Sequence, residues 1–272
     1  MTSAFSGVAE APSCALVVDV RSPDVGPDGP SPGKNLDVRR DSEDAFEPVA
    51  VPNQARAHGL GWTDRGLIEA FDPMLSDARR ERLLEVLDGR LMSVTVLLDA
   101  PHDPHNGAAV LRTCEALGIQ TVHVLPRLEE FLASRVITKG SEKWVDIVRH
   151  RSADAALRAL RALDYVLVGC HPQGELLPSS LREIPRVALV LGNEHGGICD
   201  ELERGVDRRV RVPMRGFVES LNVSVSAAVL LAQATQGRAG DLTPDERNRV
   251  HAGWLLQSVP RSGEILEALR PR

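Results

Sequence analysis

The residues best suited to chemistry lie in a segment that runs from Val212 to Ala228. Its polar residues Ser220, Asn222 and Ser224 alternate with apolar ones just before a run of small, apolar residues that predicts a helix. Backbone N–H groups are unpaired where a helix begins, so polar side chains there can bind a ligand or take part in catalysis. A helix cap needs only one such residue, and simple capping remains the alternative interpretation.

A second group of polar residues follows an apolar run and a loop rich in proline and histidine, Leu98 to His105. Asn106 can cap the helix that follows this loop. Arg112 lies about one and a half turns into that helix, so its long side chain can reach back to the loop. A plain cap and a solvated helix charge are the alternatives for these two residues.

A third group is the glycine-rich stretch Gly192-Asn193-Glu194-His195-Gly196-Gly197, which follows another apolar run. The glycines allow the backbone to approach a ligand closely. Glu194 could bind a ribose or an amine, or could cap a helix that starts near Cys199. The spacing matches neither GxGxxG nor a P-loop, which disfavours a Rossmann dinucleotide site and an NTPase.

Short continuous runs of Val, Leu and Ile alternate with helical periods, which predicts an α/β fold: a parallel sheet with helices on both faces. The predicted strands are 94–98, 121–125, 165–169, 187–191 and 209–212. The predicted helices begin near 75 and span 106–117, 154–163, 221–234 and 243–257. Ligands of such sheets bind at the carboxyl ends of strands, where all three groups lie.

Composition narrows the class of protein. The chain has 272 residues, 43% of them hydrophobic, which suits a sizeable core. No apolar run approaches the roughly 18–20 residues of a membrane span, and the first ten residues lack the pattern of a signal peptide. The four cysteines are too far apart for a CxxC-type metal site. We therefore expect a cytoplasmic protein with reduced thiols, no metal and no membrane partner.

Charge is distributed unevenly along the chain. The net charge is −6, and residues 1–72 account for all of it with 12 acidic and 6 basic residues. Pro and Gly recur through 22–33, and no apolar period persists before residue 73. We therefore predict a mostly disordered acidic extension over 1–72, a folded domain over 73–260 and a tail over 261–272. The remaining basic residues are almost all Arg, whose planar fork suits phosphate.

Together, the three groups resemble the SPOUT-class RNA 2'-O-ribose methyltransferases. The matching pieces are, in order, His105-Asn106 with Arg112-Thr113, Ser141-Glu142-Lys143-Trp144, Gly192-Asn193-Glu194 with Gly196, and Pro213-Met214 with Ser220-Leu221-Asn222-Val223-Ser224. The resemblance covers about residues 75–260. It is nearest to the tRNA guanosine-18 2'-O-methyltransferases, whose Arg-rich first helix and helical C-terminal extension are similar to those of this chain.

This resemblance implies a SPOUT fold with a C-terminal trefoil knot, a homodimer, S-adenosylmethionine as methyl donor and tRNA as substrate. The cofactor contacts that it implies are Gly169, Leu191, Gly192, Val212, Met214 and Leu221. The catalytic residues that it implies are Arg112, Asn106, Glu194, Ser220 and Asn222.

The family assigns activation of the ribose 2'-hydroxyl to the arginine that matches Arg112. Since Arg stays protonated, we expect Arg112 to hold the hydroxyl and the adjacent phosphate and to stabilise developing negative charge. A phosphate oxygen or water would accept the proton. Asn106 would position Arg112 or the ribose, and the other three residues would shape the site.

RNA affinity should come mainly from basic residues that contact phosphate. The candidate RNA contacts are His105, Lys143, Arg79, Arg80 and Arg238, with Arg82, Arg90, Arg247 and Arg249 as further basic candidates. The chain departs from the family at Asp103, where a basic residue is common. Alternatives are an rRNA 2'-O-methyltransferase and a non-catalytic RNA-binding protein on the same scaffold. We also hypothesise that the acidic extension competes with RNA for the basic face.

Overall fold

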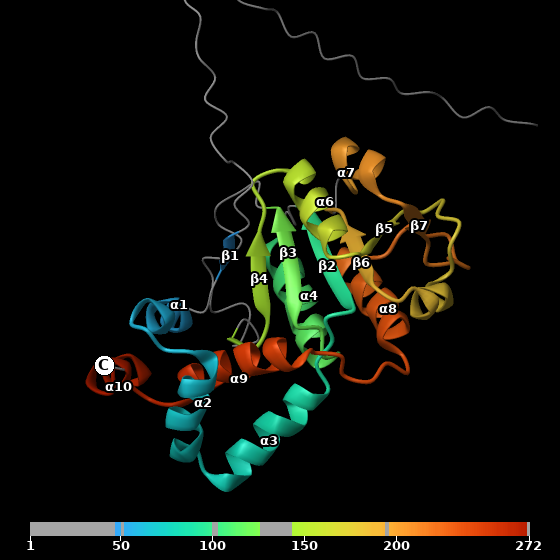
Figure 1. Cartoon of the computed structure of the whole chain (residues 1–272). Helices are drawn as coiled ribbons and strands as arrows, with labels where there is room; N and C mark the ends of the chain where they lie inside the picture. Colours follow the sequence, from blue (N-terminus) through green and yellow to red (C-terminus); the bar gives the residue numbers. More distant parts are fainter. Residues whose placement is uncertain (1–46, 50–51, 100–102, 126–142, 194–195, 271–272) are drawn as a thin grey trace, which may run out of the picture. The chain divides into compact units, whose positions relative to one another are not determined.

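A computed structural model describes residues 47–49, 52–99, 103–125, 143–193 and 196–270. All of these residues belong to one compact unit of the chain, Asp44–Arg272. Its centre is a seven-stranded sheet with the strand order β1-β4-β3-β2-β6-β5-β7 (Figure 1). The strands are β1 Glu47–Val49, β2 Val94–Asp99, β3 Thr121–Leu125, β4 Asp146–Arg149, β5 Val166–Cys170, β6 Val187–Leu191 and β7 Arg208–Val210.

Strands β2 to β7 run parallel to their neighbours, and only β1 is antiparallel, against β4. The predicted parallel sheet is therefore confirmed, and the five predicted strands appear as β2, β3, β5, β6 and β7. Strand β4 was not predicted, because only Ile147 and Val148 separate the charged residues at its ends. The trefoil knot that the resemblance implies stays a prediction.

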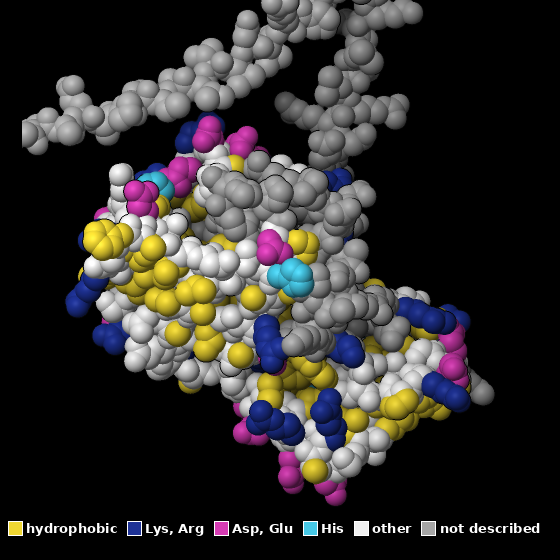
Figure 2. All heavy atoms as spheres, turned by 180° about the vertical axis from the view of Figure 1, so that it is seen from behind, with side chains coloured by type: hydrophobic (Ala, Val, Ile, Leu, Met, Phe, Trp, Pro, Cys, Tyr) yellow, Lys and Arg dark blue, Asp and Glu magenta, His cyan; other side chains and the backbone are white. Residues whose placement is uncertain are grey.

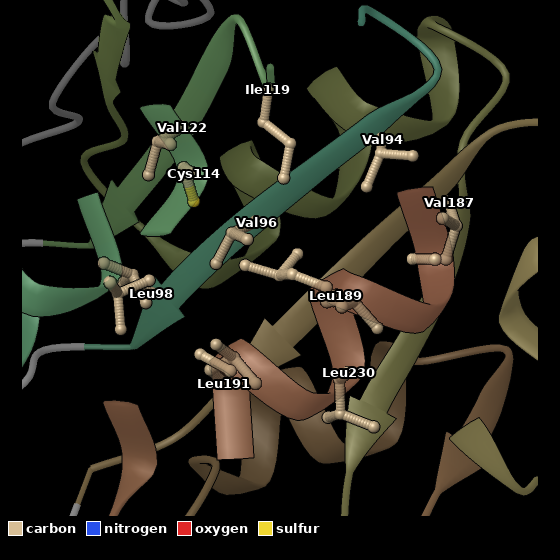
Figure 3. Packing of buried hydrophobic residues seen from close by; sticks show 14 of the residues in the cluster. Val94, Val96, Leu98, Cys114, Ile119, Val122, Val187, Leu189, Leu191 and Leu230 are labelled. Carbon is tan, nitrogen blue, oxygen red and sulfur yellow. The ribbon is translucent and has the colours of Figure 1, made fainter. Parts of the chain in front are cut away.

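Helices cover both faces of the sheet, as predicted (Figure 1). Successive strand residues point to opposite faces, and β2 shows the consequence. Val96 and Leu98 join one core with residues of α4 (Pro104–Ala116) and α8 (Val223–Thr235). Leu97 joins a second core with residues of α6 (Ala153–Ala162) and α7 (Asp200–Gly205). Figure 3 shows the first core, with Leu230 of α8 beside Leu189 and Leu191 of β6.

A third core joins helices from the two ends of the described chain. Its helices are α1 Pro52–Gly59, α2 Asp64–Phe71, α3 Asp77–Asp88, α9 Pro244–Ser258 and α10 Ser262–Ala268. Leu67 and Phe71 of α2 are fully buried and belong to the same cluster as Trp254 and Leu255 of α9. None of the described helices is both long and apolar enough to cross a membrane.

This helical cluster corrects the predicted boundaries. Residues 52–72 are folded rather than part of an extension, because the i, i+4 pair Leu67 and Phe71 gives α2 an apolar face and Thr63 caps its start. The predicted tail from 261 likewise contains α10, with Leu266 buried. Residues 1–46 lie outside the described residues.

Candidate functional site

The three groups of polar residues lie at neighbouring strand ends. They follow β2, β6 and β7, and the sheet order places β2 beside β6, with β5 between β6 and β7. Because these strands are parallel, their carboxyl ends share one edge of the sheet. Two hydrogen bonds tie the groups together: Asn222 Nδ2 donates to Asn106 Oδ1 at 3.0 Å, and the Cys199 backbone N–H donates to Asp99 Oδ2 at 2.7 Å.

Helix α4 begins two residues earlier than predicted, and this changes the role of Asn106. Pro104 is its first residue, and the Asp103 side chain caps it by accepting from the His105 N–H at 2.8 Å. The prediction that Asn106 caps this helix is therefore wrong. Its side chain instead reaches across to Asn222. The acidic residue that departs from the family pattern thus serves as the helix cap.

Arg112 is exposed on α4, on the same helix face as His105 and Ala109, which lie seven and three residues earlier. Within the described part of the chain, no hydrogen bond or ion pair is recorded for its guanidinium. An exposed arginine on the same helix as Asn106 can hold an anionic ligand in a bidentate manner.

Asn222 has two tasks at the start of α8. Its Oδ1 caps the helix by accepting from the Ser224 backbone N–H at 2.8 Å and from the Ser224 hydroxyl at 2.6 Å. Its Nδ2 holds Asn106. Ser220 is exposed two residues earlier. Of the alternating polar residues in this segment, Asn222 therefore caps the helix, whereas Ser220 remains exposed at the surface.

The loop after β6 is folded tightly on itself. Asn193 and Gly197 exchange backbone hydrogen bonds of 3.0 and 3.2 Å, and Asn193 Oδ1 accepts from the Gly196 N–H at 2.8 Å. A Cβ on Gly192 would lie 2.0 Å from the Gly197 carbonyl carbon. Gly192 is therefore required by the loop's own packing. Glu194 lies outside the described residues, and its catalytic role stays a prediction.

The predicted cofactor contacts divide into two groups. Leu191 and Gly169 are buried, and a Cβ on Gly169 would lie 3.2 Å from Ile198 Cδ1, so these two residues support the loops from beneath. Val212 and Met214 are half-buried, and Leu221 is 36% exposed. From Val212 to Leu221, no backbone–backbone hydrogen bond to the described residues is recorded. The peptide groups of this segment are therefore available to a ligand.

The predicted RNA contacts differ in their exposure and in their partners within the protein. His105 and Lys143 are exposed, and the exposed Arg79 lies with its guanidinium 5.6 Å from the centre of the Trp144 ring. Arg80 is held by Asp72 and Asp77 through hydrogen bonds of 2.7 and 2.8 Å.

Arg238 does not fit the predicted RNA-binding role. Its guanidinium donates to the backbone carbonyls of Ala234, Pro185 and Ile184, so it joins α8 to the segment before β6. Arg90 is fully buried and donates to the carbonyls of Glu115 and Trp144. Both predictions are wrong for the same reason: backbone carbonyls take up the donors that a phosphate would need.

Asp99 was missed by the sequence analysis. It is the last residue of β2 and is fully buried, yet its carboxylate reaches the loop after β6. A carboxylate at the end of an otherwise apolar strand, directly before a candidate loop, was the available signal.

Comparison with known proteins shows the same combination of fold and motifs elsewhere. Residues 93–232 match the SpoU rRNA Methylase family. The tRNA (guanosine(18)-2'-O)-methyltransferase of Thermus thermophilus is 34% identical over 190 residues, which cover 66% of this chain and 97% of that protein. The 23S rRNA (guanosine-2'-O-)-methyltransferase RlmB of Xanthomonas campestris is 30% identical and covers 76% of this chain and 80% of its own length. The crystal structure of the A. aeolicus TrmH/SpoU tRNA modifying enzyme superposes with a TM-score of 0.60 at 28% identity, over 68% of this chain and 98% of that one.

Proposed function

Because this chain belongs to the SpoU family of RNA 2'-O-ribose methyltransferases, we propose that it methylates tRNA at the 2'-hydroxyl of guanosine 18, with S-adenosylmethionine as the methyl donor. The observation that carries this proposal is the hydrogen bond between Asn106 and Asn222, which joins the start of α8 to α4, the helix that also carries the exposed Arg112. The similar proteins of Thermus thermophilus and Escherichia coli, both named tRNA (guanosine(18)-2'-O)-methyltransferases, support the choice of nucleotide.

The residues present fit S-adenosylmethionine. This group supplies a methyl on a positively charged sulfur, so the donor is already activated and needs mainly to be positioned. The segment Val212–Leu221 offers peptide groups without recorded backbone partners, together with the half-buried side chains of Val212 and Met214. Polar peptide groups beside apolar side chains suit a ligand with an adenine ring and a charged amino-acid part. Leu221 and the loop that begins at Gly192 would complete the contacts.

The site residues of the chain would act on the ribose. Arg112 would hold the 2'-hydroxyl and the neighbouring phosphate and stabilise negative charge as it develops on the oxygen. The Asn106–Asn222 pair would fix the ribose against α4 and α8, and Ser220 would line the same edge. The proton would leave to a phosphate oxygen or to water, because a guanidinium is already protonated.

Further exposed cations would hold the RNA backbone. Arg79, Lys143, Arg149 and Arg151 are exposed, and no carboxylate partner is recorded for them among the described residues. Figure 2 shows Lys and Arg side chains on the lower part of the molecule, where Figure 1 places α3. Binding through such residues should weaken steeply as salt rises.

A homodimer is part of the proposal. Val225, Val229 and Ala232 form an exposed apolar stripe on α8 at i, i+4 and i+7, and Leu221 extends it. Figure 2 shows hydrophobic side chains gathered on part of the face that it presents. Apolar patches of this kind commonly mark protein–protein contacts. The stripe lies on the helix that Asn222 caps, so a second copy seated there would lie next to the site.

The test is to incubate the protein with S-adenosylmethionine labelled on the methyl group and with separate tRNA and rRNA preparations. Mass spectrometry of nuclease fragments would then locate the modified nucleotide. We expect 2'-O-methylguanosine at position 18 of tRNA, and loss of methylation in a transcript with a 2'-deoxy residue there. Methylation of rRNA alone would assign the rRNA activity instead. RNA binding without methyl transfer would assign a non-catalytic role.

A further inference from the structure

The buried carboxylate of Asp99 occupies a position that none of the site roles above explains. It ends β2, and the chain continues from it toward Asn106 and Arg112. Its Oδ2 accepts from the backbone N–H of Cys199 at 2.7 Å, across 100 residues of sequence. Asp99 therefore links the first and second polar groups, just as the Asn106–Asn222 contact links the first and third.

Both ends of the loop 192–198 are attached to the end of β2. At the loop's entrance, Leu191 of β6 pairs with Leu98 of β2 in the parallel register. At its exit, the next residue, Cys199, is held by Asp99. Between these ends, the described residues Asn193 and Gly197 exchange two backbone hydrogen bonds.

The attachment at the loop's exit depends on one side chain. At the loop's entrance, several backbone hydrogen bonds hold β6 in register with β2. At its exit, the chain is held by the Asp99 carboxylate and by the contact of Ile198 with Gly169. A buried charge-assisted hydrogen bond is short and directional, so it sets position more strictly than apolar packing does. Removing it would let the exit of the loop, and with it the start of α7, shift by fractions of an ångström.

We propose that Asp99 is a positioning residue for the methyl-donor site: it fixes the exit of the loop after β6 and thereby the backbone of its described residues 196–198, which would bind S-adenosylmethionine. This inference rests on the proposed function, since it concerns the cofactor of that reaction. Asp99 touches neither substrate nor cofactor in this role. It acts through the Cys199 N–H, in the way that supporting residues generally hold a binding loop to sub-ångström accuracy.

The experiment compares S-adenosylmethionine affinity, measured by calorimetry without RNA, with thermal stability. Asp99→Ala removes the acceptor, and we expect the affinity to fall at least 10-fold. Asp99→Asn keeps an oxygen that can accept from Cys199, and it should stay within about 3-fold of the wild type. The KM for tRNA at saturating cofactor should change by less than 2-fold in both variants.

A second pair of variants removes the same hydrogen bond from the donor side. Cys199 has φ −66°, which proline adopts readily, so Cys199→Pro deletes the N–H with little change in backbone conformation. The Cys199 thiol also contacts Asp99, so the control is Cys199→Ala, which lacks the thiol but keeps the N–H. We expect weakened cofactor binding in the proline variant and normal binding in the alanine variant. This pair keeps the proposal testable if Asp99→Ala does not fold.

Asp241 provides the matched control at the other end of the same strand. Its carboxylate accepts from the backbone N–H groups of Met92 and Ser93, at 2.5 and 3.2 Å, where the chain enters β2. Asp241→Ala should lower the melting temperature and leave S-adenosylmethionine affinity within 2-fold. If Asp99→Ala and Cys199→Pro behave in the same way as Asp241→Ala, the positioning role is overturned. If the wild type itself does not bind S-adenosylmethionine, the proposed function fails instead.

Discussion

Arg112 is the residue on which the proposed chemistry depends most. It is exposed and has no recorded partner among the described residues, so its charge is unused by the fold. Arg112→Ala should lower the single-turnover rate of methyl transfer by roughly 10²–10³-fold, the usual loss for a donor that stabilises a developing oxyanion. The melting temperature and the affinity for S-adenosylmethionine should stay near wild type, because no recorded contact is lost.

Arg158→Ala is a suitable control, because Arg158 is exposed on α6 and pairs with Asp154 one turn earlier. It should leave the rate unchanged. Arg112→Lys should recover part of the rate, since an ammonium keeps the charge but loses the planar fork. A fully active alanine variant would remove Arg112 from the reaction.

The two roles of Asn222, capping α8 and contacting Asn106, can be separated by substitution. Asn222→Asp keeps the oxygen that caps α8 and loses the Nδ2 donor to Asn106, so stability should be retained while kcat falls about 10-fold or more. Asn222→Ala removes both contacts and should also cost about 1 kcal/mol of stability, as for other lost caps. Thermal melts and methyl-transfer kinetics on both variants make the comparison. Full activity of Asn222→Asp would show that the contact with Asn106 is incidental.

At the scale of elements, the sequence predicts the sheet well and the helical cluster poorly. Strands such as 94–98 and 187–191 are continuous apolar runs, and burial on both faces of a parallel sheet permits only such runs. Helix α2 has just Leu67 and Phe71 to mark its buried face, and its partner α9 is almost two hundred residues away. Local pattern cannot reveal a partner at that distance, so the acidic composition and weak helical period of this stretch predict an extension.

The candidate site, too, could be predicted only in part from the sequence. Residues that end strands or begin helices could be placed from the sequence, because the carboxyl edge of a parallel sheet gathers them. Their contacts could not, since the link from Asn222 to Asn106 spans 116 residues and the link from Cys199 to Asp99 spans 100. Arg238 and Arg90 illustrate the opposite error, because a sequence does not show which arginines meet backbone carbonyls in the fold.

A buried histidine pair, with His123 in β3 and His150 directly after β4, should make the fold sensitive to acid. His123 Nδ1 lies 2.8 Å from Nε2 of His150, with the rings stacked. Burial, and then the neighbouring His150, lowers the pKa of His123 to about 3, and burial lowers the pKa of His150 to about 4.

An unfolded histidine titrates near pH 6.5, so the unfolded chain binds more protons than the folded chain below that value. The stability from this pair is therefore complete above about pH 6.5 and declines as the pH falls toward 4, by up to about 1.4 kcal/mol per pH unit for each histidine. Urea unfolding at pH 7, 6 and 5 measures the slope. His150→Gln should reduce the slope without abolishing it, because His123 and His251, whose pKa burial also lowers, still contribute. His105→Gln, at an exposed position, should not alter it. An unchanged slope in His150→Gln would assign the acid sensitivity to other groups.

At the scale of the whole molecule, the two ends of the described chain stabilise each other through the helical cluster. A truncation at the predicted boundary, which removes 1–72, would strip Leu67 and Phe71 from the core shared with α9. Losing either side chain alone typically costs about 2–5 kcal/mol, so this truncation should unfold the cluster and yield insoluble protein. Removal of 1–46 spares these contacts and should leave the melting temperature unchanged. A stable, soluble protein that lacks 1–72 would show that the cluster is dispensable.

The truncation that spares the cluster also tests what the acidic extension does. Residues 1–46 hold 8 acidic and 4 basic residues, so their removal changes the net charge from −6 to −2. If the extension competes with RNA for the exposed cations, the truncated protein should bind tRNA several-fold more tightly at low salt, and the difference should vanish as salt screens both interactions. Filter binding at two salt concentrations measures this. Replacing the 8 acidic residues with Asn or Gln in the full-length chain should reproduce the effect, which separates charge from chain length. Equal affinities at low salt would refute competition, and weaker binding would show that the extension itself holds RNA.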